Sequence, residues 1–154
     1  MKSNKIALLA ILLWVATVVL FAWFFVRGNT TAGTDNRTAV VLNAGERDLV
    51  LKEMRGLLSS VNGILQGINQ NDMGLVAKSA RAAGMASAAD VNPALMAKLP
   101  LPFKSLGMSL HKDMDELANA AESGKPAPEL MKMLTGTLDK CVGCHAGWQI
   151  KAGE

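Results

Sequence analysis

The feature that most constrains this chain is an uninterrupted apolar run near its start. Ile6 to Val26 gives 21 positions without a charged side chain. As an α-helix this run would be about 32 Å long at ~1.5 Å per residue, which matches a bilayer hydrocarbon core of ~30 Å. We therefore expect residues 1–27 to form a transmembrane anchor.

The charges beside the run predict its orientation. Lys2, Lys5 and the terminal amine precede it, whereas Arg27 follows it among neutral polar residues. The positive-inside rule then places the N-terminus in the cytoplasm and the soluble domain in the periplasm, as a single-pass protein of the inner membrane. A cleaved signal peptide is the alternative, but the run exceeds the usual apolar core of ~7–15 residues and no clear small-residue cleavage pattern follows Phe25.

Residues 28–43 have a different composition from the segments on either side. They are polar and rich in Gly and Thr until the short AVVL stretch, and they show no helical periodicity. This pattern predicts a flexible linker. We expect it to separate a domain of residues 44–154 from the membrane surface.

The net charge of +3 does not indicate a nucleic-acid partner. The chain holds 16 Lys or Arg and 13 Asp or Glu, and the residues before Thr38 account for the excess, with Lys2, Lys5, Arg27 and Arg37 against Asp35. Because the remaining charges balance, we expect no nucleic-acid binding.

The domain sequence is typical of an all-α fold. Ala, Leu, Met and Gly are plentiful, aromatic residues make up 5% of the chain, and we find no strand signal. Apolar residues at three-to-four spacing predict four amphipathic helices, over about Gly45–Asn69, Asp72–Ala89 and Pro102–Ser123, and from Pro128 to Trp148. Three prolines between the second and third helices predict a crossover loop with one short turn at Ala94–Lys98. We expect an antiparallel four-helix bundle.

The last predicted helix carries CVGCH, Cys141 to His145, which contains both cysteines and one of the two histidines of the chain. A disulfide would constrain little there, a redox pair would need a thioredoxin-like βαβ setting, and a structural zinc site would lack a fourth ligand. CxxCH is instead the attachment signature of c-type haem. On a helix Cys141, Cys144 and His145 leave within a ~100° arc, so both thiols can bind one haem c covalently while the imidazole coordinates its iron.

With this motif in its last helix, the chain resembles the cytochrome c prime superfamily. The resemblance covers about Ala44 to Lys151 and includes the LPLPFKSL and SLHKDMDELANAAESG runs. Members of that superfamily are four-helix bundles with CxxCH near the end of the last helix. They often carry an aromatic and a basic residue after the motif, whereas here Trp148 is followed by Gln149, with Lys151 beyond.

The resemblance implies that the first helix supplies the residue on the other haem face. A Met there gives six-coordinate iron suited to electron transfer, and a Leu gives five-coordinate iron that admits small gases. Met54 is the expected sixth ligand, so that His145 and Met54 are the metal ligands. Leu57 or Leu58 is the non-ligating alternative, and ordinary core filling by Met54 stays open.

Three other side chains each have two interpretations. Lys52 and Arg55 beside Met54 could approach a haem propionate or could be solvated surface charges. We expect His111, in the third helix, to be hydrogen-bonded or to lie at the haem edge.

Taken together, the sequence predicts a membrane-anchored periplasmic monohaem c-type cytochrome that carries single electrons between membrane redox complexes. Its expected partners are inner-membrane or periplasmic redox proteins. The resemblance leaves a homodimer open, because bundles of that superfamily often dimerise. Because no nucleophile–base pair or paired-carboxylate pattern is present, we do not expect an enzyme. Two alternatives stay open: a five-coordinate haem protein that binds nitric oxide or carbon monoxide, and a fixed electron-transfer subunit of a larger membrane complex.

Overall fold

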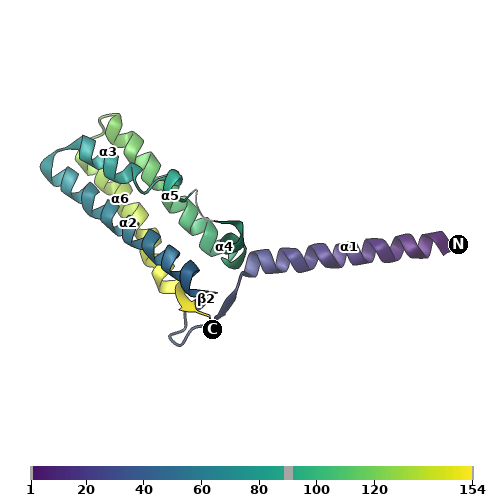
Figure 1. The fold of residues 1–154 in the computed structure, drawn as a ribbon. Helices are drawn as coiled ribbons and strands as arrows, with labels where there is room; N and C mark the ends of the chain where they lie inside the picture. Colours follow the sequence, from purple (N-terminus) through teal and green to yellow (C-terminus); the bar gives the residue numbers. More distant parts are fainter. Residues whose placement is uncertain (1, 89–91, 154) are drawn as a thin grey trace.

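The computed structural model describes residues 2–88 and 92–153 and is mainly helical (Figure 1). The helical class and the N-terminal apolar helix that the sequence predicts are confirmed. Along the chain the elements are α1 (Lys2–Arg27), β1 (Thr30–Ala32), β2 (Thr38–Leu42), α2 (Ala44–Gln70), α3 (Met73–Arg81), the 3-10 helix η1 (Met85–Ala88), α4 (Pro93–Lys98), α5 (Leu101–Glu122), α6 (Ala127–Gly147) and β3 (Trp148–Ala152).

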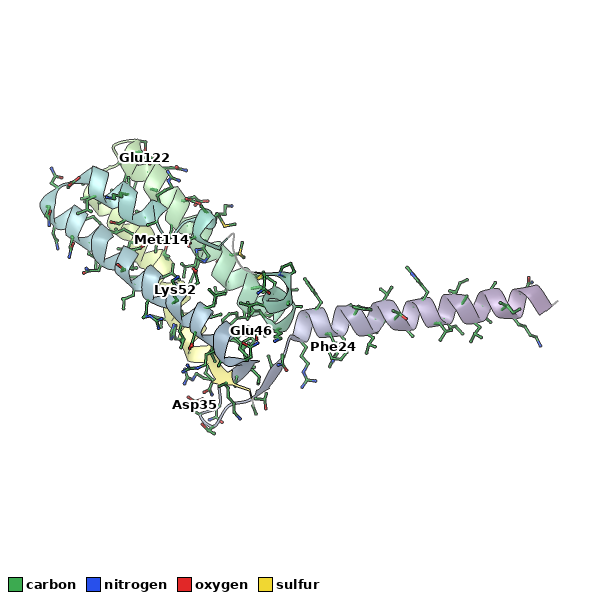
Figure 2. All side chains as sticks on the ribbon, in the orientation of Figure 1. Phe24, Asp35, Glu46, Lys52, Met114 and Glu122 are labelled. Carbon is green, nitrogen blue, oxygen red and sulfur yellow. The ribbon has the colours of Figure 1, made fainter. Side chains whose placement is uncertain are left out.

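Helix α1 extends away from the rest of the protein (Figure 1). Within its segment Asn4–Arg27 an 18-residue window has a mean hydropathy of 2.7, and none of that window is buried. Figure 2 shows its side chains projecting outward along its length. Among the described residues it is the one helix that is long and apolar enough to cross a membrane.

Helices α2, α3, α5 and α6 pack around a shared apolar core. Each contributes a side chain with no exposed surface, namely Ile64, Val76, Leu117 and Leu134 in that order. Burying an aliphatic side chain of this size contributes about 1.5–3 kcal/mol. The three-to-four spacing in the sequence therefore places its apolar positions where they stabilise the fold.

The boundaries of α2, α5 and α6 agree closely with the sequence predictions, but α3 ends earlier than expected. Its last residue is Arg81, and the 3-10 helix η1 follows after a turn. The carboxylate of Asp115 on α5 accepts the Met85 N–H at 2.9 Å and a hydrogen bond from Arg81 at 3.1 Å. Asp115 of α5 thus accepts the Met85 N–H, which would have bonded within α3 if that helix were longer. The predicted end of the helix at Ala89 lies outside the described residues.

The structure corrects the expectation of a chain without strands. Strand β2 pairs antiparallel with β1 and parallel with β3, which directly follows α6, so that Val40 lies opposite Ile150. Val40 and Leu42 are buried with Leu95 and Leu99 in a second apolar cluster. The β-branched residues of TAVVL suit a strand, but the partner strand lies more than 100 residues away in the sequence.

Residues 28–43 therefore differ from the flexible linker that the sequence predicts, and they bond the end of α1 to the domain. Gly28 has a φ of 63°, which turns the chain directly after the helix. The backbone N–H of Asn29 donates to the Lys98 carbonyl at 2.7 Å, and its side-chain amide donates to the Val41 carbonyl at 2.9 Å. Helix α1 thus leads into a structured junction.

Candidate functional site

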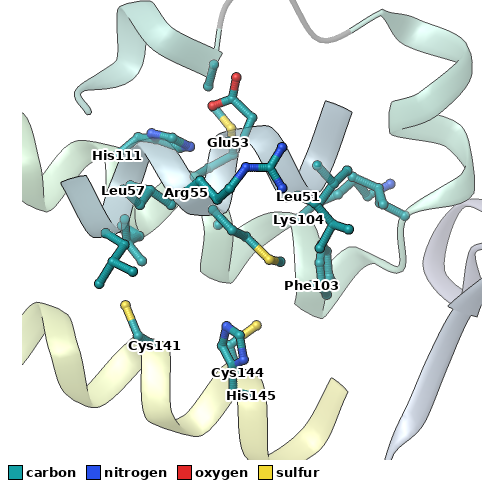
Figure 3. A pocket seen from close by; sticks show the side chains of 18 of the residues that line it. Leu51, Glu53, Arg55, Leu57, Phe103, Lys104, His111, Cys141, Cys144 and His145 are labelled. Atoms are coloured by element: carbon teal, nitrogen blue, oxygen red, sulfur yellow. The ribbon is translucent and has the colours of Figure 1, made fainter. Parts of the chain in front are cut away.

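Cys141, Cys144 and His145 lie in the last two turns of α6, which ends at Gly147. Figure 3 shows the three side chains on one side of this helix, where they face a cavity. Val142, between the cysteines, is 68% exposed and points elsewhere. Helical spacing therefore gathers the two thiols and the imidazole on one wall, as expected for i, i+3 and i+4 positions.

The cavity has a volume of about 580 Å³, within the range of ~300–1,000 Å³ that is common for ligand sites. Helices α2, α5 and α6 supply most of its walls, and residues of α4 also line it. Its lining is largely apolar, and its ionisable members are Glu53, Arg55, Lys104, His111, Cys141, Cys144 and His145. A site of this kind suits a mostly apolar ligand with a few polar groups.

Met54 lines this cavity from α2, together with Leu57 and Leu58. It also lines a smaller adjoining hollow with Cys144 and His145. Met54 is half-buried and belongs to neither apolar cluster, whereas Leu57 packs against the main core and Leu58 is 70% exposed. The structure thus brings all four predicted site residues to one cavity and leaves the Met54 thioether outside the core packing.

Other methionines also line the cavity, so its methionine content alone does not single out Met54. Met114 is 1% exposed and belongs to the main core, and Met96 packs against the second cluster. Met108 on α5 is half-buried and outside both clusters, but it does not line the hollow that Met54 shares with His145. Met108 is therefore the natural comparison for Met54.

Both thiols are in the environment of a protonated cysteine. Burial raises the pKa of the Cys141 thiol. Burial also raises the pKa of the Cys144 thiol, and a negative charge on neighbouring Cys141 would raise it further. Both lie near the negative C-terminal end of α6, whereas reactive cysteines of redox proteins have a lowered pKa, often at a helix N-terminus. The surroundings do not favour a thiol–disulfide exchange site.

The end of α6 is held by the turn between β1 and β2. Arg37 donates from Nη1 to the backbone carbonyls of His145 at 3.2 Å and Trp148 at 3.4 Å. Asp35 binds the same guanidinium at 2.6 Å and accepts a hydrogen bond from Gln149 at 2.9 Å. The hydrogen bond between them lowers the pKa of Asp35 and raises that of Arg37. This network satisfies carbonyls that the end of the helix leaves open.

His111 is 8% exposed and lines the cavity from α5. Its Nδ1 lies 2.9 Å from the Ala83 carbonyl oxygen, so the proton on Nδ1 is donated to that oxygen, and Nε2 is the nitrogen without the proton in the neutral ring. Lys52 and Arg55 are both exposed, although Arg55 also lines the cavity.

Sequence reasoning missed two residues of this site. Lys104 lines the cavity and is 7% exposed, and Arg37 binds the His145 carbonyl. Lysine and arginine are ordinarily exposed, and no local pattern marks these two, because their surroundings come from distant segments.

Comparison of the chain with known protein families, with curated proteins and with solved structures finds no significant match.

Proposed function

We propose that the chain is a membrane-anchored, periplasm-facing monohaem c-type cytochrome that carries single electrons between membrane redox complexes. In this proposal α2, α3, α5 and α6 are the four-helix bundle of the cytochrome c prime superfamily, which the sequence resembles. The observation that carries it is one apolar cavity with the two CxxCH thiols and His145 on one wall and the Met54 thioether on another.

The residues around the cavity fit haem c. Cys141 and Cys144 would hold it through thioether bonds, and His145 and Met54 would bind its iron. The bound iron would supply one-electron redox chemistry between its ferric and ferrous states. The apolar lining would exclude water, and the Arg37 network would hold the helix end that carries His145. Among the described residues, no group of three or more His, Cys, Asp or Glu is arranged to hold a metal ion.

The anchor gives this carrier its location. Helix α1 would span the inner membrane through Ile6–Val26, and confinement near the bilayer raises the effective concentration of the domain at membrane partners. Since the chain leaves α1 through the Gly28 turn and is bonded at Asn29, the cavity would face those partners in a preferred orientation.

The first experiment tests haem attachment. The full chain is produced in a host that matures c-type cytochromes, and the intact mass and optical spectrum are recorded beside those of Cys141→Ser and Cys144→Ser. We expect one covalent haem in the native chain and loss of one thioether bond in each variant. A bare polypeptide with two free thiols would refute the proposal.

A second experiment tests the sixth ligand and separates electron transfer from gas binding. The reduced native protein should show the sharp bands of six-coordinate iron and respond little to carbon monoxide at first. Met54→Leu should bind carbon monoxide immediately, whereas the matched control Met108→Leu should behave like the native chain. Immediate binding by the native protein would instead support a gas-binding function, and a stable assembly that co-purifies in mild detergent would support a fixed subunit.

A further inference from the structure

Lys104 is a buried cation at the junction between α1 and the domain. It lies in the first turn of α5 and is 7% exposed. Its ammonium sits 3.8 Å from the centre of the Phe25 ring and donates to the Phe25 carbonyl at 3.3 Å. Burial lowers its pKa. The C-terminal end of α1 and an aromatic face thus offer it partial compensation.

This compensation is incomplete. An ammonium group has three N–H donors, and in the described part of the chain one carbonyl accepts from it while no carboxylate forms an ion pair with it. Its place in the first turn of α5 is also unfavourable, because that end of a helix carries partial positive charge. Because a buried charge is usually paired, we expect an anion to bind beside the Lys104 ammonium.

Lys104 also lines the cavity, together with Cys141 and His145. In Figure 3 Lys104 lies at the end of the cavity away from Cys141. The acidic substituents of haem lie on the edge of the ring opposite its two vinyl-bearing positions. A haem attached through Cys141 and Cys144 would therefore present carboxylates away from these thiols.

We propose that Lys104 is the counter-ion of a haem propionate, so that the acidic edge of the cofactor faces the end of the membrane helix. This inference rests on the proposed function. The sequence alone suggested Lys52 or Arg55 for this role; both are exposed, although Arg55 also lines the cavity, whereas Lys104 is buried. One ammonium would then contact both the anchor, through Phe25, and the cofactor.

The test compares full-length haem-loaded variants by redox titration over a range of pH. Lys104→Met and Lys104→Gln remove the charge, Lys104→Arg keeps it, and Lys112→Met is the control. Lys112 lies on the same helix with its side chain 72% exposed. Removing a cation beside the haem should lower the midpoint potential, and the propionate titration in the potential–pH profile should move up by about one to three pH units.

The other ionisable groups near this position do not change between the variants. They are Glu53, Arg55, His111 and His145 in the cavity wall, Arg27 beside Trp23 on α1, and Lys98 paired with Glu46. A further variant, Phe25→Leu, removes the aromatic contact and keeps the ammonium. If Lys104 acted only by holding α1 against the domain, Phe25→Leu would shift the propionate titration in the same way as Lys104→Met. We expect Phe25→Leu to leave the pH of that titration unchanged.

Each outcome has a definite meaning. Absence of haem from the native chain refutes the proposed function itself. Haem-loaded Lys104→Met or Lys104→Gln with the native potential and profile overturns the counter-ion role alone. A shift seen only in bilayers of anionic lipid, and absent in uncharged detergent, assigns the ammonium to a lipid phosphate and overturns it too. Loss of haem loading in both neutral variants with normal loading in Lys104→Arg supports it.

Discussion

Replacing Gly28 with alanine tests whether α1 is joined to the domain through an ordered turn. Gly28 adopts a φ of 63°, and a Cβ built there would lie 2.5 Å from the Lys98 carbonyl oxygen and 2.5 Å from the Pro100 nitrogen. Both neighbours are backbone atoms, so the overlap can be relieved only by moving the α4–α5 connection away from the end of α1.

Two contributions determine how much Gly28→Ala lowers the free energy of opening the junction. An alanine in the left-handed region costs ~1–2 kcal/mol. Moving the Lys98 carbonyl away breaks its 2.7 Å hydrogen bond with the Asn29 N–H, which contributes about 1 kcal/mol. The free energy of opening the junction should therefore fall by about 2–3 kcal/mol, and exchange of the Asn29 amide hydrogen should become about 30- to 150-fold faster.

Hydrogen exchange followed by mass spectrometry on the full chain in detergent measures this change. Gly124→Ala is the matched control, because Gly124 has a φ of 77° but its Cβ would meet nothing within 4 Å. It should show strain in its own turn and leave Asn29 unaffected. If the Asn29 amide of the native chain exchanged as fast as an unprotected amide, the ordered junction would be refuted and residues 28–43 would be the flexible linker that the sequence predicts. Equal protection of Asn29 in both chains would instead contradict the overlap expected at Gly28.

Three further predictions concern the core, acid stability and the end of α6. Leu134 is fully buried and does not line the cavity. Leu134→Ala should therefore lower the free energy of unfolding, measured by denaturant titration, by about 2–5 kcal/mol. A loss below about 1 kcal/mol would contradict the place of Leu134 in the core. The hydrogen bond from Lys98 lowers the pKa of Glu46 from its ordinary 4.5, so this pair stabilises the fold at neutral pH, and its contribution is lost as pH falls through the lowered pKa. Glu46→Gln should therefore be less stable than the native chain at neutral pH and equal to it in strong acid, whereas an equal difference at both would disprove the linkage. Arg37→Met should speed amide exchange in the last turn of α6 and in β3, where the His145 carbonyl loses its donor, while the first half of α6 stays protected; unchanged exchange at the helix end would exclude the positioning role.

Much of the candidate site could be predicted from the sequence because its chemistry is encoded locally. The spacing of Cys141, Cys144 and His145 fixes their common direction on any helix, and the structure places all three along one cavity. The prediction of Met54 has a different basis, namely its position in the first amphipathic helix and the family resemblance. Its presence in the same cavity agrees with that expectation, and whether it binds iron stays a prediction.

The sequence by itself determined the apolar helix of residues 6–26, the helical character of the domain and the grouping of the CVGCH side chains. Each depends on residues within a few turns of one another, where periodicity and composition decide the outcome. Only the tertiary structure decided that β2 pairs with β3, that Arg37 reaches the His145 carbonyl 108 positions away, and that Lys104 is buried under Phe25. Such contacts depend on which distant segments pack together, and a lysine or arginine is exposed unless that packing covers it.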